Sequence, residues 1–205
     1  MSKKLVIATR NAGKIIEFRR ILEAVSAGAV ELVGIDQFPD LVDVEETGTT
    51  FQENALLKAR YTAKMTGLPS ISDDSGLCID ALEGAPGIFS ARWAGTHADD
   101  KANVEKVLDE LSAVPDEKRG AYFICVAALV MPDGREEVAE GRFEGRILHS
   151  AIGDQGFGYD PIFAPLGMSI SSAQMSADEK DACSHRGKSL RLIAPHVIEM
   201  LGGLG

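Results

Sequence analysis

The sequence is short of cysteine, of basic blocks and of long apolar runs, and each shortage excludes a class of protein. Its three cysteines lack C-x-x-C spacing, so they indicate neither a disulfide framework nor a zinc site. The longest apolar run, Tyr122 to Met131, is about half of the roughly 20 residues that a membrane helix needs. The N-terminus also lacks the long apolar centre of a signal peptide. We therefore expect a cytoplasmic protein with reduced thiols.

The charge balance restricts the partners. The chain carries 31 acidic and 21 basic residues, a formal net charge of −10 at pH 7, and no block of five or more Lys and Arg. This charge repels a polynucleotide backbone, so we expect neither polynucleotide nor membrane as a partner. Small anionic substrates remain candidates, because a local basic cluster and a metal ion can hold them. With 205 residues and 45% apolar content, the chain can form one domain with a large core, covering 1–205.

The most informative segment, Thr9 to Lys14, lies between the apolar run 5–8 and a helical pattern. A loop that follows a strand and opens a helix presents unpaired N–H groups and partial positive charge, which hold anions. Gly13 permits close backbone approach, and Thr9 and Asn11 offer hydrogen bonds. Lys14 stands where a helix usually prefers an acid, which suggests a bound anion. The spacing differs from the P-loop, and a polar strand–helix turn explains the segment equally well.

Hydrophobic periodicity predicts alternating helices and strands, and therefore an α/β fold. A β-hairpin is expected where the Pro132-Asp133-Gly134 turn joins two extended runs, so we predict a mixed sheet. The polar stretch 83–96 is a candidate lid or wall. Helices are expected over apolar positions 15, 18, 22 and 25, from the Thr50 and Glu53 capping box to about Gly67, and at about 98–112 and 184–201; strands are expected at 5–8, 31–35, 70–72, 120–131, 136–143, 146–150 and 161–163, with 77–79 extended.

Acidic residues gather around the capped helix and at the end of the expected strand 70–72. Glu45 and Glu46 precede the helix, and Asp73 and Asp74 follow the strand. Mg²⁺ is usually held by one or two carboxylates plus substrate phosphates, so these acids suggest a magnesium site. Because adjacent strand side chains face opposite ways, only one of the two Asp residues is expected to face the same ion as Glu46. Alternatively the glutamates form a solvated helix-start cluster, with Glu53 as a cap, and the Asp pair forms a turn.

A glycine-rich segment, 153–161, suggests recognition of a nucleobase. Its three glycines surround Phe157 and Tyr159 before a proline, which favours a rigid turn that presents an aromatic ring and a carboxylate. Aromatic faces stack on nucleobases. Alternatively the segment is a glycine bulge whose aromatic residues enter the core.

Basic residues at two further places are candidates for binding a substrate. The first place is the segment 184–188, which begins the last expected helix, with Lys180 just upstream. Basic side chains there oppose the helix dipole, so an anionic or carbonyl-bearing ligand explains them better than helix stability does. His185 lacks a nearby nucleophile constellation, so we interpret it as a recognition donor. Lys58 is an ordinary solvated lysine unless its helix face turns toward the acids, where it could pair with phosphate.

These segments together resemble the inosine triphosphatase family, the dITP/XTP pyrophosphatases. They occur in the order typical of the family and cover nearly the whole chain. Arg10 stands where many relatives carry glycine. The motifs that carry the resemblance are Thr9-x-Asn11-x-x-Lys14, Glu45-Glu46-Thr47-Gly48, Thr50-Phe51-x-Glu53-Asn54-Ala55-x-x-Lys58-Ala59, Asp73-Asp74-Ser75-Gly76-Leu77, Gly87-x-x-Ser90-Ala91-Arg92, Gly156-Phe157-Gly158-Tyr159-Asp160-Pro161-x-Phe163 and Ser184-His185-Arg186-Gly187.

The resemblance implies a fold, a reaction and a set of site residues. It implies a homodimer whose chain forms an elongated mixed sheet with two lobes around a substrate cleft. It also implies Mg²⁺-dependent hydrolysis of ITP, dITP and XTP to the monophosphate and pyrophosphate, which removes deaminated purines from the nucleotide pool. On this chain, Glu46 and Asp74 would bind the metal, and Asp74 would accept a proton. Substrate contacts would come from Thr9, Arg10, Asn11, Ala12, Gly13, Lys14, Lys58, Ser75, Phe157, Gly158, Tyr159, Asp160, Lys180, His185 and Arg186.

Two alternatives stay open beside this function. One is a pyrophosphatase or phosphatase for another modified nucleotide, which the released product distinguishes. The other is a non-catalytic nucleotide-binding module. Such a module would not need a carboxylate that activates water. Hypoxanthine carries a carbonyl acceptor where adenine carries an amino donor, so a fixed donor such as His185 or Arg186 would favour the deaminated base.

Overall fold

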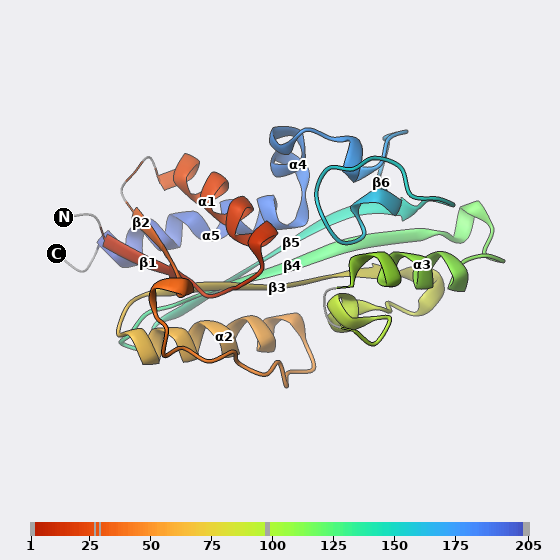
Figure 1. Cartoon of the computed structure of the whole chain (residues 1–205). Coiled ribbons are helices and arrows are strands. Elements are labelled where there is room, and N and C mark those ends of the chain that lie inside the picture. Colours follow the sequence, from red (N-terminus) through yellow and green to blue (C-terminus); the bar gives the residue numbers. More distant parts are fainter. Residues whose placement is uncertain (1–2, 27, 29, 97–98, 203–205) are drawn as a thin grey trace. The chain divides into compact units, whose positions relative to one another are not determined.

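The computed structural model describes residues 3–26, 28, 30–96 and 99–202. Over this part of the chain six strands form one sheet in the order β2-β1-β3-β4-β5-β6, with helices beside the strands (Figure 1). Parallel and antiparallel pairs both occur, which confirms the predicted α/β class with a mixed sheet. The helices are α1 (Ala12–Ser26), α2 (Phe51–Thr66), α3 (Asp100–Glu110), α4 (Ala177–Cys183) and α5 (His185–Gly202); the strands are β1 (Lys3–Ile7), β2 (Val30–Gly34), β3 (Ser70–Ile79), β4 (Gly120–Val130), β5 (Glu136–Ile147) and β6 (Phe163–Pro165).

The chain divides into two compact units. Unit 1 comprises Met1–Asp74, Cys125–Gly141 and Arg186–Gly205, and unit 2 comprises Ser75–Ile124 and Arg142–His185. The boundaries therefore fall inside β3, β4 and β5 and after the first residue of α5, and each of these strands contributes residues to both units.

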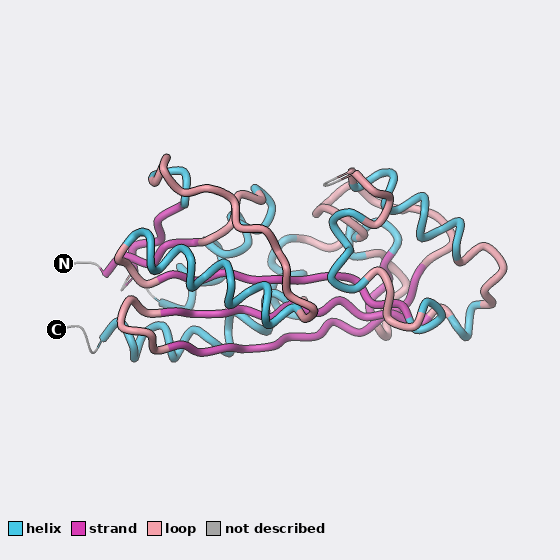
Figure 2. The backbone as a smooth tube through the Cα atoms, turned by 90° about the horizontal axis from the view of Figure 1, so that it is seen from below, coloured by secondary structure: helices cyan, strands magenta, loops and turns pink. Residues whose placement is uncertain are grey.

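In unit 1 the sheet is buried on both faces. Strand β1 pairs in parallel with β2 and β3, and its residues Leu5, Val6 and Ile7 are fully buried. Successive β4 residues point to opposite faces, as strand geometry requires. Ala127 and Leu129 pack into the cluster formed with α1 and α5, whereas the alternate β4 residues Val126, Ala128 and Val130 pack against α2. Figures 1 and 2 accordingly show α2 on the opposite side of these strands from α1 and α5.

Helix α2 begins and ends as predicted. Thr50 accepts a hydrogen bond from the Glu53 backbone N–H, and the Glu53 carboxylate accepts one from the Thr50 N–H, which completes the capping box. Gly67 ends the helix in the left-handed conformation at φ +67°, where glycine has no steric penalty. The cap fixes where the helix starts, and therefore which of its residues face β3.

Unit 2 has its own hydrophobic core, which lies between α3 and the strand segments of this unit. Leu77, Phe123 and Phe163 are among its buried residues, and α3 contributes Val107. Strand β6 pairs antiparallel with the end of β5, where Gly145 lies opposite Pro165. A Cβ atom at Gly145 would lie 2.3 Å from the Ala164 carbonyl oxygen, so the close approach of these strands requires glycine.

Strand continuity differs from the prediction in two places. Strand β3 runs without a break from Ser70 to Ile79, so Asp73 and Asp74 lie inside a strand and not at its end. Strand β5 likewise continues to Ile147, whereas the sequence suggested separate pieces that ended at Ser150. Local composition favoured a turn or a break at both places, but pairing with neighbouring strands outweighs a weak local propensity.

Two other elements were misplaced or missed. The expected strand 161–163 is a 3₁₀ turn over Asp160–Ile162, because Pro161 has no N–H to donate to a sheet, and β6 starts only at Phe163. Helix α4 was not predicted, although Ser176 and Glu179 form a capping box that signals it. Helix α3 begins at Asp100 after the cap residue Asp99; the predicted start at Ala98 lies outside the described residues.

The β4–β5 hairpin confirms its predicted turn, in which Gly134 at φ +90° donates its N–H to the Met131 carbonyl.

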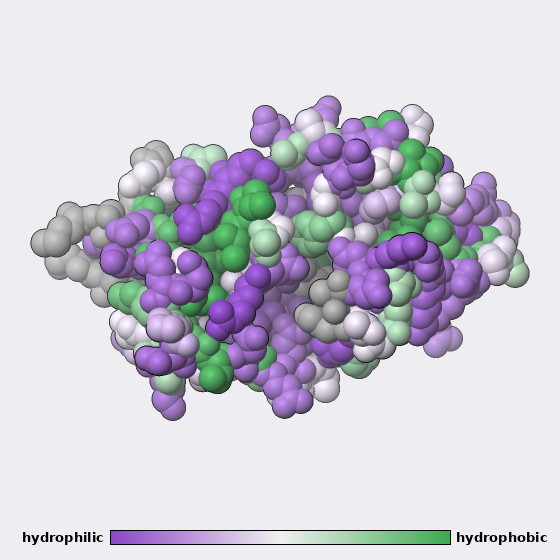
Figure 3. Space-filling model, in the orientation of Figure 1, coloured by the Kyte–Doolittle hydropathy of each residue, from purple (hydrophilic) through white to green (hydrophobic). Residues whose placement is uncertain are grey.

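Hydrophilic and hydrophobic residues are interspersed on the face shown in Figure 3. Within the described ranges, no helix is both long and apolar enough to cross a membrane.

Candidate active site

The predicted phosphate loop has the expected place between β1 and α1. Asn11 acts as a helix cap, since its side-chain Oδ1 accepts the Lys14 backbone N–H at 3.0 Å. Thr9 Oγ1 accepts the Asn11 N–H at 3.2 Å. Arg10 turns to the following loop, where its guanidinium donates to Asp43 Oδ1 at 2.6 Å and to the Leu41 carbonyl at 2.7 Å. The polar side chains of the loop therefore order its own backbone and tie it to the segment that precedes Glu46.

Lys14 finds its counter-ion within the protein. Its Nζ lies 3.1 Å from Asp73 Oδ2, and the first turn of α1 contains no acid. The lysine that seemed misplaced against the helix dipole is thus matched by the carboxylate of a neighbouring strand. A bound anion is not needed to explain its position, although the side chain remains 14% exposed.

Asp73 is the centre of a fully buried charge network in unit 1. Its Oδ2 accepts hydrogen bonds from Arg186 Nε at 3.2 Å and Nη2 at 3.0 Å, while Arg186 Nη1 pairs with Glu17. Burial alone would raise the pKa of Asp73, but the charges of Lys14 and Arg186 hold it well below its usual range. The same carboxylates overcome the effect of burial on Arg186 and raise its pKa. Asp73 and Arg186 are therefore ionised at neutral pH.

Asp74 has a different environment on the opposite face of the strand. Its Oδ2 accepts one hydrogen bond from Asn54 Nδ2 at 3.1 Å, and Asn54 Oδ1 accepts the Gly48 N–H at 2.8 Å. Burial raises the pKa of Asp74, the nearby Glu46 adds to this effect, and Lys58 opposes it. The two neighbouring carboxylates therefore have different partners and opposite pKa shifts, as expected for adjacent side chains of a strand.

Lys58 faces the acids and is not an ordinary surface lysine. Its Nζ lies 2.5 Å from Glu46 Oε1, and its side chain is 16% exposed. Burial disfavours its charge, but the carboxylates of Asp74 and Glu46 outweigh burial and raise its pKa. Glu45 and Glu53 follow the alternative of a solvated helix start, since both are exposed and Glu53 acts as the cap.

Glu46 and Asp74 offer carboxylate oxygens, the kind of ligand that Mg²⁺ takes. The described residues contain no group of three or more His, Cys, Asp and Glu side chains that could hold a metal ion by themselves. Mg²⁺ needs only one or two protein carboxylates when substrate phosphates and water complete its shell. Glu46 raises the pKa of Asp74, which indicates that the two negative charges are close. A bound cation would relieve their repulsion.

In unit 2 the segment 156–160 forms a tight turn around Asp160. The buried Asp160 Oδ2 accepts the Phe157 N–H at 2.9 Å and Lys180 Nζ at 2.6 Å. Gly156 has φ +77°, and a Cβ atom there would lie 2.1 Å from Asp160 Oδ2. Both the backbone conformation and the close approach therefore require glycine.

The two aromatic side chains of this turn have different environments. Tyr159 is buried in the core of unit 2, its hydroxyl donates to the Ser90 carbonyl at 2.8 Å, and burial raises its pKa. Phe157 stays half-buried, and Lys180 Nζ lies 5.2 Å from its ring centroid, within cation–π distance. The core alternative thus holds for Tyr159, whereas Phe157 keeps a partly accessible ring.

At the start of the last helix, His185 and Arg186 are buried, whereas Lys188 is exposed. His185 is stacked on Phe123, with ring centroids 4.8 Å apart and an interplanar angle of 13°. Arg186 is 2% exposed and has protein carboxylates as partners. The carboxylates of Asp73 and Glu17 therefore explain the position of Arg186 in the first turn of α5 without an external anion.

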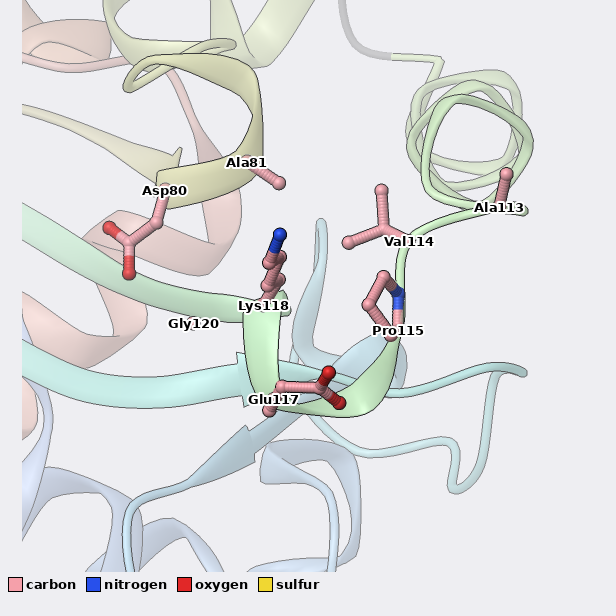
Figure 4. A pocket seen from close by; sticks show the side chains of 8 residues that line it. All are labelled: Asp80, Ala81, Ala113, Val114, Pro115, Glu117, Lys118 and Gly120. Atoms are coloured by element: carbon pink, nitrogen blue, oxygen red, sulfur yellow. The ribbon is translucent and has the colours of Figure 1, made fainter.

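A cavity of about 510 Å³ lies in unit 2 (Figure 4), but none of the predicted site residues lines it. Its walls come from the 3₁₀ turn that follows β3, the α3–β4 connection and the start of β4, and include Asp80, Val114 and Lys118. The chemistry-bearing groups described above lie elsewhere, so this cavity is not the predicted site.

The model of the Ham1 family matches residues 5–196. The chain belongs to the Ham1 family. A relative from Streptomyces avermitilis named dITP/XTP pyrophosphatase is 55% identical over 200 residues, which cover 97% of this chain and 99% of the relative. The family resemblance seen in the motifs is thereby confirmed.

Solved structures support the same assignment. A crystal structure from Mycobacterium abscessus, described as a nucleoside-triphosphatase and dITP/XTP pyrophosphatase, is 48% identical with a TM-score of 0.76, over 94% of this chain and 99% of that chain. The Ham1 protein of Coxiella burnetii is 40% identical with a TM-score of 0.85, over 96% and 99% of the two chains. The Ham1 fold therefore extends over nearly the whole chain.

Sequence reasoning found most members of these clusters in the Ham1 chain but missed three. Glu17, Asn54 and Cys125 contact the predicted residues Arg186, Asp74 and Asp73 respectively. Glu17 lies three residues after Lys14, so a shared helix face was the available signal. Asn54 stood within a quoted motif, whereas an apolar strand gave no signal for Cys125.

Proposed function

We propose that this chain hydrolyses ITP, dITP and XTP to the nucleoside monophosphate and pyrophosphate, and so removes deaminated purine nucleotides from the pool. The observation that carries this proposal is the pair of adjacent buried carboxylates with opposite pKa shifts, surrounded by two lysines, in a chain of the Ham1 family. The names of the relatives, dITP/XTP pyrophosphatase, support the same substrates. The reaction adds water to a phosphorus atom and breaks the bond between the α- and β-phosphates.

Asp74 is our candidate for the proton acceptor. Burial raises its pKa, and a carboxylate with a raised pKa is a stronger base than an ordinary one. Asn54 fixes one carboxylate oxygen by its hydrogen bond. Asp73, in contrast, stays ionised with Lys14 and Arg186, so we assign it the positioning of these two cations.

We propose that Glu46 and Asp74 hold Mg²⁺ together with substrate oxygens. When bound, the ion would neutralise phosphate charge and orient the reacting groups. Lys58 is already paired with Glu46 beside Asp74, where it can contact a phosphate oxygen. Thr9, Arg10, Asn11, Ala12, Gly13 and Lys14 are the proposed phosphate loop at the start of α1.

The groups of unit 2 are our candidates for contacts with the base. The half-buried Phe157 ring offers a stacking surface, and Gly158, Tyr159 and Asp160 fix the turn that carries it. Lys180 and His185 of this unit and Arg186 of unit 1 are the proposed donors to the substrate, with Ser75 as a further contact. A donor to the carbonyl at purine position 6 would reject adenine, because the mismatched edge leaves buried groups unpaired.

We further propose a cytoplasmic homodimer in which 1–205 forms a single catalytic domain. A protein that clears nucleotides must meet them where they are pooled, and reduced cysteines agree with this compartment.

The test is steady-state hydrolysis of ITP, XTP, GTP and ATP with and without Mg²⁺, with pyrophosphate and phosphate measured separately. Metal-dependent pyrophosphate release, much faster from ITP and XTP, is the expected result. Release of phosphate, equal rates for all bases or no turnover would refute the proposal. Asp74→Asn should abolish turnover with an unchanged circular dichroism spectrum, whereas the control Asp109→Asn, on an exposed position of α3, should keep the wild-type rate.

A further inference from the structure

Cys125 is a buried member of the charge network around Asp73. It lies on β4 in unit 1 and is 0% exposed. Its Sγ is 3.5 Å from Asp73 Oδ2 and 3.2 Å from Ser189 Oγ. A thiol in a fully apolar environment would need no such partners, so this cysteine does more than fill space in the core.

The proton of the thiol has two possible acceptors. Ser189 Oγ also lies 3.1 Å from the Arg186 carbonyl, and a hydroxyl has only one proton to donate. The Asp73 carboxylate is paired with the cations of Lys14 and Arg186, and its Oδ2 is an acceptor within reach of the thiol. Burial and the neighbouring Asp73 raise the pKa of Cys125 to about 12, and the thiol therefore keeps its proton at neutral pH.

The donors around Asp73 are unevenly distributed. Two Arg186 nitrogens, Lys14 Nζ and Cys125 Sγ all contact Oδ2. Oδ1 is also buried, yet it has no hydrogen-bond partner among the described residues. Contacts concentrated on one oxygen fix the rotation of the carboxylate and the places of the cations that contact it.

We propose that Cys125 is a positioning residue, whose thiol donates to Asp73 Oδ2 and so helps to hold the carboxylate that positions Lys14 and Arg186. The role in turnover rests on the proposed function, whereas the hydrogen bond itself does not. Cys125 contacts neither substrate nor metal in this proposal, and its thiol is neither oxidised nor deprotonated.

The hydrogen bond is tested without any activity by infrared spectroscopy of the S–H stretch. Cys78→Ala/Cys183→Ala leaves Cys125 as the sole thiol, and Ser189→Ala is then added. If the thiol donates to Asp73, the band keeps the low frequency of a hydrogen-bonded thiol after Ser189→Ala. A shift to the frequency of an unbonded thiol would show that Ser189 is the acceptor and would overturn the proposal.

Kinetics then test the positioning role. Cys125→Ala should lower kcat for ITP about fivefold with little change in KM, because one hydrogen bond is lost and the carboxylate can rotate. Cys125→Ser should restore most of kcat, since its hydroxyl is again a donor. Cys78→Ala, a buried thiol of unit 2, is the matched control and should keep the wild-type rate.

The two failures are distinguishable. Equal losses of kcat in Cys125→Ala and Cys125→Ser, or an unchanged kcat in both, would overturn the positioning role. The proposed function would still stand as long as the wild-type protein releases pyrophosphate. If the wild-type protein releases no pyrophosphate, the proposed function fails, and the role of Cys125 in turnover fails with it. The infrared measurement still decides whether the thiol donates to Asp73.

Discussion

Arg186 provides the sharpest test of the energetics in this fold, because the chain contains a matched arginine on the surface. Arg186 pairs with Asp73 and Glu17, and none of the three side chains is more than 9% exposed. Arg60 donates two hydrogen bonds to Glu136, at 2.9 and 2.6 Å, but these side chains are 56% and 35% exposed. The two arginines thus have similar chemistry and differ mainly in burial.

Removing the charge of each arginine should have very different costs. Arg186→Met keeps an apolar side chain but leaves its two carboxylate partners buried without the arginine charge. Breaking a buried ion pair in this way costs about 3–5 kcal/mol of stability. Arg60→Met exposes its partner to water and should cost about 0–1 kcal/mol, as surface pairs do. The measurement is the free energy of unfolding from urea titrations at neutral pH. Equal losses in the two variants would refute the reasoning.

The pH dependence of the same two proteins gives a second check. The folded-state pKa of Asp73 is depressed, so the carboxylate stabilises the fold above its unfolded pKa, and this stabilisation is lost as the pH falls. Arg186→Met removes one of the charges that lower the pKa of Asp73. The stability difference between wild type and Arg186→Met should therefore shrink as the solution is acidified below the ordinary range of an aspartate. A difference that is constant from neutral to acidic pH would contradict the assigned network.

Three further predictions follow from individual contacts. Arg10→Gly and Asp43→Asn should both raise the Mg²⁺ concentration for half-maximal activity about two- to fivefold if their ion pair orders the loop before Glu46; an increase in the KM for ITP in Arg10→Gly alone would indicate direct phosphate contact instead. Lys180→Met should lower the free energy of unfolding by about 3–5 kcal/mol, since Asp160 stays buried without its partner; thermal unfolding indistinguishable from wild type would disprove this. The pKa of Cys125 is raised to about 12 in the folded protein, so its contribution to stability is complete below the ordinary thiol pKa and is lost as the pH rises toward 12. In this alkaline window the free energy of unfolding of the wild type should fall by about 1.4 kcal/mol more per pH unit than that of Cys125→Ser.

Much of the fold is encoded by local patterns in the sequence. The capping box at Thr50 and the terminal Gly67 fixed both ends of α2, because caps depend on residues only three or four positions apart. Helix α4 carries the same kind of signal at Ser176, and attention to that capping box would have located it. Patterns of this range need no knowledge of the tertiary structure.

The continuity of β3 could not be read in the same way. Asp73 and Asp74 before a serine and a glycine have the composition of a turn, yet both lie inside a buried strand. A strand can bury them only because Lys14, Arg186 and Asn54 supply donors from three helices. Arg186 is 113 residues from Asp73 in the chain, so no local pattern contains this compensation.

The sequence by itself determined the fold class, the family and the inventory of reactive groups, since these depend on short motifs and their order. The tertiary structure alone decided which charges meet. It paired Lys14 and Arg186 with Asp73, left Asp74 with Asn54, and brought Lys58 to Glu46. A pKa depends on burial and on charges within a few ångströms, and residues distant in the sequence supply both. For this reason two adjacent, chemically identical aspartates acquire opposite shifts, and their different roles follow from the fold.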